Sequence, residues 1–182
     1  MDKVDVAIIG AGPVGLSLVS LLVGSGLQVA VVEQQAAAAV AEPAFDGREI
    51  ALTHASRSVL EQAGIWSQLE SSTIWPLRQA SVRDGHLPFS LDVDNRRDPG
   101  GAPLGWLVAN WRIRKAAWQA ASRCDGWSLL DGASLSHLQR QGDGWQLQLA
   151  DGRCLQARTV IAADSRFSAT RRMLGVGARS RD

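Results

Sequence analysis

The stretch VDVAIIGAGPVGLSLVSLLVGSGLQVAVVE, residues 4–33, decides the fold of this 182-residue chain. Its first six residues are mostly apolar and β-branched, which is typical of a strand buried on both faces of a parallel sheet. Residues 13–25 carry apolar side chains at helical spacing, and Gly26 is a suitable helix end. Residues 29–33 form a second apolar run that ends in an acid. The stretch therefore predicts a strand, helix and strand unit of about 30 residues.

A glycine pattern, Gly10-Ala11-Gly12-Pro13-Val14-Gly15, stands between the first strand and the helix. Gly10 permits the tight turn, Gly12 lets a diphosphate approach the backbone, and Gly15 lets the helix pack closely on the strand. The helix N-terminus then offers free N–H donors and the positive end of its dipole to the diphosphate. The carboxylate of Glu33, at the end of the second strand, can accept hydrogen bonds from both hydroxyls of an adenosine ribose. We expect a dinucleotide site formed by Gly10, Gly12, Pro13, Val14, Gly15, Glu33 and Gln34.

This glycine pattern does not by itself distinguish FAD from NAD. The acid at Glu33 argues only against NADP at this site, because a carboxylate would repel a 2′-phosphate.

The middle of the chain predicts loops and two helices. We expect a loop over the alanine-rich residues 36–44 and a helix over Ile50–Ala63, ending at Gly64. Val82–Pro103 is rich in Asp, Arg, Gly and Pro, which indicates a strand followed by a long loop. Asn110–Ser122 has the composition of a second helix.

The last third of the chain predicts an antiparallel insertion and a return to the first sheet. Short strand-like runs occupy Trp127–Leu130, Ser134–Gln139, Trp145–Leu149 and Cys154–Gln156. Asp143-Gly144 and Asp151-Gly152 are typical of hairpin turns between them. Residues 158–163 are mostly apolar again, and we expect this run to rejoin the first sheet. The predicted fold class is α/β, with a Rossmann-like GxGxxG sheet and an antiparallel β insertion.

Composition excludes several classes of function. The net charge is +1 and no basic block occurs, so nothing predicts nucleic-acid binding or a polybasic membrane anchor. Glycines interrupt the apolar residues 4–26 at a turn, which argues against a signal peptide or membrane span and favours a cytoplasmic protein. Cys124 and Cys154 are expected to be free thiols. The histidines at 54, 86 and 137 share no ligand spacing, so we expect no metal site.

Three separated blocks resemble the class A flavoprotein monooxygenases, and within them the ubiquinone-biosynthesis hydroxylases. These blocks are the glycine pattern, residues 46–52 (DGREIAL) and residues 163–172 (ADSRFSATRR). The resemblance implies a para-hydroxybenzoate hydroxylase-like fold with FAD as cofactor and NAD(P)H as transient reductant. It further implies O2-dependent hydroxylation of a small aromatic or prenylated aromatic substrate, such as a ubiquinone precursor.

The resemblance also implies roles for residues outside the glycine pattern. Arg48 matches an arginine that reaches the flavin side of FAD, where a guanidinium neutralises diphosphate charge. Arg114 matches a basic helix residue near the cofactor, and Asp164 matches the aspartate of an Asp-Gly motif. Ser165 stands in place of that glycine, and serine enters the positive-φ region less readily. No catalytic acid or base is assigned, because the cofactor carries the chemistry in such enzymes.

Members of this family are longer and carry a second Gly-Asp motif, which binds the flavin ribityl chain; no such motif follows Asp164 here. We therefore expect residues 1–182 to be the N-terminal part of an FAD-binding domain, with its C-terminal remainder absent. The start of a substrate domain is expected as an insertion at about 75–110. The 182 residues alone are expected to bind FAD weakly and not to catalyse hydroxylation.

Two other functions stay open at this point. One is a different FAD oxidoreductase, such as a reductase of a prenyl chain, and the other is a non-catalytic FAD-binding fragment. The substrate, the ring position, the choice between NADH and NADPH and the oligomeric state are not indicated. Peripheral association with the inner membrane or with a biosynthetic complex is compatible with a prenylated substrate.

Overall fold

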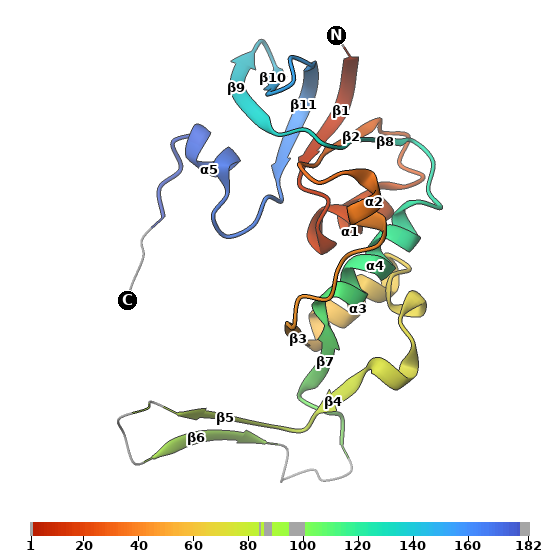
Figure 1. The fold of residues 1–182 in the computed structure, drawn as a ribbon, viewed down its shortest axis with the longest axis vertical. Helices are drawn as coiled ribbons and strands as arrows, with labels where there is room; N and C mark the ends of the chain where they lie inside the picture. The colour runs from red at the N-terminus through yellow and green to blue at the C-terminus, as the bar shows by residue number, and fades with distance from the viewer. Residues whose placement is uncertain (1, 84, 86–88, 95–100, 179–182) are drawn as a thin grey trace.

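The computed structural model describes residues 2–83, 85, 89–94 and 101–178, and its core is one mixed sheet with helices on one face (Figure 1). The strand order in this sheet is β8-β2-β1-β11-β10-β9. The parallel part consists of β8 (Trp127–Leu130), β2 (Val29–Val32), β1 (Asp2–Ile9) and β11 (Cys154–Ala162). The antiparallel part adds β10 (Gly144–Leu149) and β9 (Leu135–Gln141) beyond β11. The predicted α/β class and the return of the last strand to the first sheet are confirmed.

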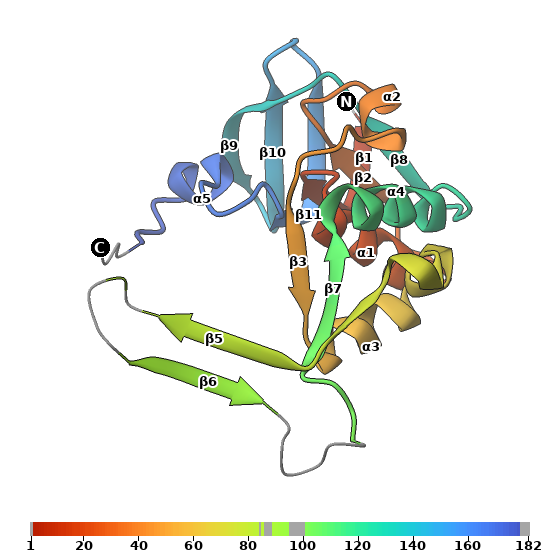
Figure 2. The same cartoon turned by 60° about the horizontal axis from the view of Figure 1, so that its bottom comes forward.

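Two helices cover one face of the parallel strands and enclose the main core (Figure 2). They are α1 (Pro13–Leu22) and α4 (Asn110–Ala121), which pack against each other. Pro13 occupies the first turn of α1, where its fixed φ suits a helix start. Leu16 and Val19 are buried at 1% exposure. The helix ends earlier than the predicted Ser25, because Gly24 already adopts a positive φ.

A second core lies on the other face of the parallel strands. The alternate residues of β1 and β2, such as Ala7 and Val32, pack with Leu155 from β11 and Leu147 from β10. Apolar residues therefore cover both faces of β1 and β2, as the continuous hydrophobic runs predicted.

The region predicted as one helix over Ile50–Ala63 contains a strand and a shorter helix, so that prediction is wrong at its start. β3 (Glu49–Leu52) pairs antiparallel with β7 (Gly105–Ala109), and α3 (His54–Gln62) follows. Thr53 separates the two elements, because its side-chain oxygen accepts a hydrogen bond from Ser56 N and caps α3. The partner strand lies far away in sequence, and local helix propensity could not indicate it.

Two further predictions need correction. The alanine-rich residues expected as a loop contain a short helix, α2 (Ala37–Ala41), since alanine has the highest helix propensity. The run at β8 is not part of the antiparallel insertion, because it pairs in parallel with β2 at the sheet edge. The separately predicted Cys154–Gln156 and the following apolar run form one strand, β11.

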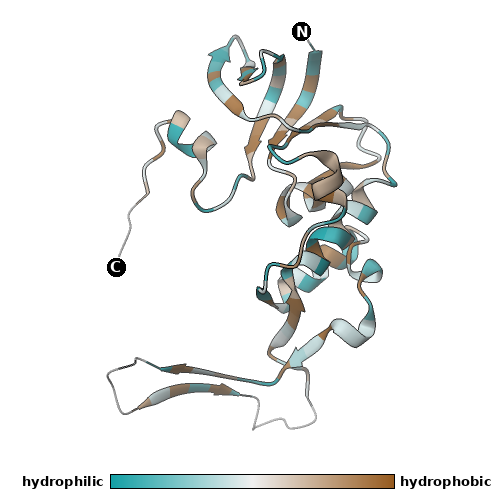
Figure 3. Ribbon diagram, in the orientation of Figure 1, coloured by the Kyte–Doolittle hydropathy of each residue, from teal (hydrophilic) through white to brown (hydrophobic). Residues whose placement is uncertain are grey.

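The segment predicted as a strand and a long loop contains a two-stranded hairpin that extends away from the sheet (Figures 1 and 2). Its strands are β5 (Gln79–Arg83) and β6 (Ser90–Asp94), and β4 (Trp75–Leu77) joins β7 next to it. Hydrophobic and hydrophilic segments alternate along β6 (Figure 3). The remaining part of that prediction, at 84, 86–88 and 95–100, lies outside the described residues.

Short helical elements complete the described chain: η1 (Trp66–Gln68), η2 (Ser71–Thr73) and α5 (Ala169–Met173). Among the described residues, no helix combines the length and apolar character required to cross a bilayer.

Candidate functional site

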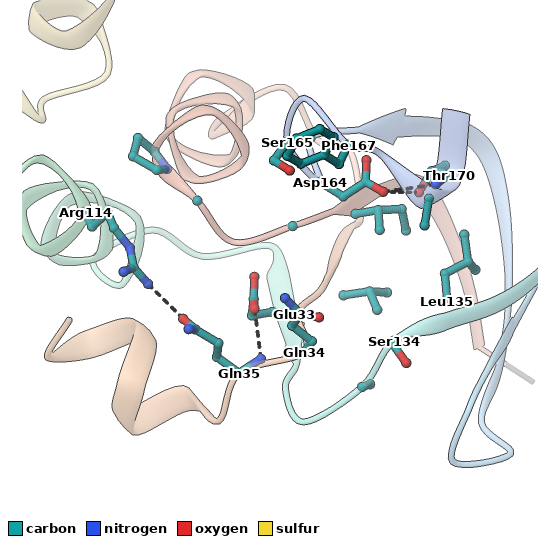
Figure 4. Close-up of a pocket in the computed structure, with 18 of the residues that line it drawn as sticks. Glu33, Gln34, Gln35, Arg114, Ser134, Leu135, Asp164, Ser165, Phe167 and Thr170 are labelled. Carbon is teal, nitrogen blue, oxygen red and sulfur yellow. Dashed lines mark hydrogen bonds between the residues drawn. The ribbon is translucent and has the colours of Figure 1, made fainter. Parts of the chain in front are cut away.

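A cleft of about 550 Å³ opens where β1, β2 and β11 end and α1 begins (Figure 4). The carboxyl ends of neighbouring parallel strands are the usual ligand site of such sheets. Most of the predicted site residues line this cleft: Gly10, Gly12, Pro13, Glu33, Gln34, Arg48, Arg114 and Asp164. Val14 does not line it and is 73% exposed, and Gly15 packs beneath the turn.

The glycine turn has the backbone geometry that only glycine accepts. Gly10 adopts a φ of +109°, and a Cβ there would lie 2.6 Å from the Ala163 carbonyl oxygen. A Cβ on Gly15 would overlap the carbonyl oxygen of Gly10, so the glycine permits the close packing of α1 on this turn. At Gly12 no atom lies within 4 Å of an added Cβ. The space beside Gly12 is therefore open for a ligand to approach the backbone.

Glu33 is held in place by backbone donors on both sides. Its Oε2 accepts a hydrogen bond from Ala11 N and its Oε1 accepts one from Gln35 N, each at 2.8 Å. Ala11 belongs to the glycine turn, so the acid and the turn are joined directly. A carboxylate has about four lone-pair sites, and two acceptor positions therefore stay available for ligand hydroxyls.

Asp164 lines the cleft beside the glycine turn and has an unpaired acceptor. Its Oδ2 accepts hydrogen bonds from Thr170 N and Thr170 Oγ1, both at 3.0 Å, whereas its buried Oδ1 has no partner among the described residues. Burial raises the pKa of Asp164, but the nearby Ser168 hydroxyl and the hydrogen bonds from Thr170 outweigh it and leave the pKa below its ordinary value. Buried acceptors are normally satisfied, so Oδ1 indicates a donor that a ligand would supply.

Ser165, next to this aspartate, adopts a φ of +79° and is the only non-glycine residue with a positive φ in the described part of the chain. The serine therefore takes, in the turn after β11, a backbone conformation that favours glycine.

Arg48 lines the cleft, but its guanidinium forms an ion pair with Asp46, two residues before it in the sequence. Its Nε and Nη2 donate to Asp46 Oδ2 at 2.9 and 2.6 Å, and the Arg48 side chain is 66% exposed. Asn110 Nδ2, at the start of α4, donates to the same oxygen at 2.6 Å. The hydrogen bond from Asn110, followed by that from Arg48, lowers the pKa of Asp46 to about 2.

Arg114 lies near the Glu33 end of the cleft, one turn beyond Asn110 in α4. Its Nη2 donates to Gln35 Oε1 at 2.8 Å, and the backbone N of Gln35 bonds Glu33 (Figure 4). The tertiary fold therefore links Arg114 to Glu33 through Gln35, whose side chain accepts a hydrogen bond from Arg114 and whose backbone N donates one to Glu33.

Several cleft residues were not predicted from the sequence. Gln35, Ser134, Leu135, Phe167 and Thr170 all line it. Ser134 lies in the connection between β8 and β9, Leu135 is the first residue of β9, and no local motif marks either residue. Thr170 lies in the third resemblance block and could have been identified as a partner of Asp164 from that block alone.

No metal centre is indicated within the described ranges, because no group of three His, Cys, Asp or Glu residues there could hold an ion. His86 lies outside the described residues. The residues present do fit a dinucleotide: an open glycine turn at a helix start, a held acid and an unpaired buried acceptor share one cleft.

Comparison with known proteins gives matches over nearly the whole chain. The profile of a family described as "FAD binding domain" matches residues 3–182. A ubiquinone hydroxylase, UbiM, of Neisseria meningitidis serogroup C is 39% identical over 181 residues, covering 98% of this chain and 39% of the relative. A 3-demethoxyubiquinol 3-hydroxylase of Escherichia coli K12 is 32% identical over 177 residues, covering 95% and 44%.

Among solved structures, PqsL of P. aeruginosa in complex with 2-aminobenzoylacetate is 26% identical, with a TM-score of 0.74 over 100% of this chain and 48% of that chain. These matches confirm the resemblance predicted from the three blocks. The chain spans about two fifths of the length of the curated relatives it matches.

Proposed function

Because this chain belongs to the FAD binding domain family, we propose that it supplies the dinucleotide-binding part of an FAD-dependent monooxygenase that hydroxylates an aromatic ring. NAD(P)H is the proposed transient reductant and O2 the source of the hydroxyl oxygen. The observation that carries this proposal is the cleft itself. The glycine turn, Glu33 and the unpaired Oδ1 of Asp164 meet there, at the carboxyl ends of parallel strands.

We propose that the glycine turn binds the diphosphate of FAD and that Glu33 binds the adenosine ribose. Gly12 provides the open approach to the backbone, and Pro13, Val14 and Gly15 form the first turn of the helix whose dipole faces the phosphates. Gln34 follows Glu33 at the cleft wall. Glu33 is oriented before the ligand arrives, because Ala11 N and Gln35 N already hold its two oxygens.

The basic residues and Asp164 are proposed to hold the other parts of the ligand. Arg114 supplies positive charge near the adenosine end, where Gln35 positions it. Arg48 reaches the flavin side once its guanidinium turns from Asp46 toward the ligand. Asp164 Oδ1 accepts a hydrogen bond from a ligand hydroxyl, which satisfies the buried oxygen.

The protein's own contribution to the reaction is binding, orientation and exclusion of water. Bound FAD supplies the redox chemistry of the hydroxylation. The described residues of this chain fix the dinucleotide at one end of the sheet by backbone donors and charge. No side chain of the chain is proposed as an acid or base for the chemical step.

The substrate and the domain arrangement are further parts of the proposal. The curated relatives named above are a ubiquinone hydroxylase and a 3-demethoxyubiquinol 3-hydroxylase, which supports a small aromatic or prenylated aromatic substrate of the ubiquinone-precursor type. We propose that the β5–β6 hairpin is the start of the substrate domain, because it leaves the nucleotide-binding sheet (Figure 2). A prenylated substrate would bring the protein to a membrane surface or a biosynthetic complex.

Two measurements test this function in the full-length protein. FAD is titrated by calorimetry, and NADPH or NADH oxidation under O2 is followed with analysis of the organic product. We expect tight FAD binding and a hydroxylated ring. A product with a reduced prenyl double bond would identify a reductase instead, and FAD binding without turnover of aromatic substrates would favour a non-catalytic binding protein.

A variant at Gly12 tests the location of the diphosphate. Gly12→Ala should weaken FAD binding roughly tenfold, because the methyl group would occupy the space open to the ligand. The free energy of unfolding should not fall, since no protein atom lies within 4 Å of the added Cβ. Unchanged FAD affinity would place the diphosphate elsewhere.

A further inference from the structure

Ser165 carries a backbone conformation that is unfavourable for its residue type. Its φ of +79° lies in the left-handed region, where the Cβ of an L-residue approaches a backbone carbonyl oxygen. Glycine accepts this region without that contact. Residues held in such conformations concentrate at ligand sites, where the surrounding structure maintains them.

The surrounding turn does maintain it. Ser168 N donates to the Ser165 carbonyl oxygen at 3.1 Å, and Ser168 Oγ accepts a hydrogen bond from Arg171 N at 2.9 Å. On the other side, Asp164 is bonded twice to Thr170. The backbone of Ser165 is therefore held by its neighbours in sequence, and its own hydroxyl takes no part in the turn.

That hydroxyl is placed at the cleft and is free to bind. Ser165 is exposed and lines the cleft, and no hydrogen bond joins its side chain to another residue that the structure describes. Figure 4 shows Ser165 beside Asp164, on the side away from Thr170. The Ser165 side chain therefore lies away from the hydrogen bonds that join Asp164 to Thr170.

The turn that carries Ser165 touches the glycine turn. Ala163 N donates to Ile9 O at 2.8 Å, and a Cβ on Gly10 would lie 2.6 Å from the Ala163 carbonyl oxygen and 3.3 Å from Asp164 Cα. The segment from Ala163 to Ser165 and the turn at Gly10 therefore form adjoining walls of one cleft.

We propose that Ser165 is a ligand-binding residue whose hydroxyl donates a hydrogen bond to a phosphate oxygen of bound FAD. This inference rests on the proposed FAD site. A glycine at this position would form the same turn with less strain but would offer no donor. The positive φ directs a short polar side chain to the wall next to the diphosphate turn, and the charged phosphate strengthens the bond.

The experiment compares Ser165→Ala with Ser165→Gly in the full-length protein, with Ser128→Ala on the exposed edge strand β8 as the control. FAD and ADP are titrated into each apoprotein, and unfolding in urea is followed without ligand. ADP carries the adenosine and the diphosphate but no flavin. A bond to phosphate should therefore affect both ligands.

We expect Ser165→Ala and Ser165→Gly to bind FAD and ADP roughly tenfold more weakly, while Ser128→Ala binds as the wild type does. Ser165→Gly should unfold at an equal or higher urea concentration than Ser165→Ala, because it relieves the strain. Wild-type affinity in both Ser165 variants would overturn the proposal, and loss of FAD affinity without loss of ADP affinity would overturn the phosphate assignment. A wild-type protein that binds neither ligand would refute the proposed function, and this inference with it.

Discussion

The strands beside the glycine turn and the β5–β6 hairpin contain similar apolar residues, but these residues are buried in the first region and exposed in the second. In β1 and β2, Ile8 and Val31 are fully buried, because helices cover one face and antiparallel strands cover the other. In the hairpin, Val82 and Leu91 are each 62% exposed. A β-branched run thus indicates a strand in both places, but burial requires partners that the run itself does not specify.

The hairpin nevertheless has a regular pattern. Its register pairs Ala80 with Val93 and Val82 with Leu91, so these four apolar residues share one face. The other face carries the polar residues Gln79, Ser81, Arg83, Ser90, Asp92 and Asp94. Alternation of this kind is typical of a sheet that packs on one side. The glycine-turn strands are buried against partners within the described chain, whereas Val82, Leu91 and Val93 on the apolar face of the hairpin are exposed.

The largest expected effect is a loss of stability from a substitution in the glycine-turn region, compared with the same substitution in the hairpin. Gly15→Ala should lower the free energy of unfolding by more than about 3 kcal/mol, because its Cβ would overlap the Gly10 carbonyl oxygen. Gly85→Ala, in the hairpin turn, should change it by less than about 0.5 kcal/mol, since no atom of the described residues lies within 4 Å of the added Cβ. Urea unfolding of both variants measures the difference. Similar stability in the two would mean that α1 can move away from the turn at low cost.

The second effect concerns ligand binding. Glu33→Ala in the full-length protein should weaken FAD binding by about 1.5–3 kcal/mol, or roughly one to two decades, because the ribose loses a charged acceptor. Asp92→Ala removes an exposed carboxylate from the hairpin and should leave FAD affinity unchanged. Flavin absorbance after dialysis gives the measurement. Retention of flavin by Glu33→Ala at the wild-type level would exclude the ribose role.

The third effect compares the same substitution at a buried and an exposed strand position. Val31→Thr places a hydroxyl where exposure is 0% and should cost about 1–3 kcal/mol of unfolding free energy. Val82→Thr, at 62% exposure, should stay within about 0.5 kcal/mol. If both variants lost the same unfolding free energy in thermal or urea unfolding, the apolar face of the hairpin that carries Val82 would be covered in solution.

The smallest effect is a pH dependence at the cleft. The folded pKa of Asp46, about 2, lies below its ordinary value of 3.8, because Asn110 and Arg48 hydrogen-bond the charged form. Its stabilising contribution is therefore complete above about pH 4 and is lost as the pH falls through 2. Asp46→Asn should be less stable than the wild type at pH 5, and the difference should shrink toward pH 2. A constant difference between pH 5 and 2, measured by urea unfolding, would show that the carboxylate's charge is not the stabilising feature.

The local sequence was sufficient to predict the strands and the helix around the glycine turn. Continuous apolar runs, helical spacing and three glycines specify β1, α1 and β2, since both faces of these strands are buried. α4 was also predicted almost to the residue, because its helical composition is a local property.

Sequence reasoning failed where an element depends on a distant partner. Residues 50–52 were predicted as the start of a helix but belong to β3, because β7 pairs with them. The run at β8 was expected in the antiparallel insertion and lies beside β2. Backbone pairing supplies the deciding hydrogen bonds in both places, and local propensity does not contain them.

The sequence by itself determined the βαβ unit, the family and the residues expected at the dinucleotide, because glycine spacing and strand periodicity depend on neighbours along the chain. Only the tertiary structure decided which side chains complete the cleft. It joined Arg114 to Gln35, paired Arg48 with Asp46, left Asp164 Oδ1 without a partner and held Ser165 at a positive φ. The bond from Arg114 to Gln35 joins segments far apart in sequence. The Arg48–Asp46 pair and the turn at Ser165 are local, but the preference of each single residue does not indicate their geometry, because hydrogen bonds within the folded turn outweigh it.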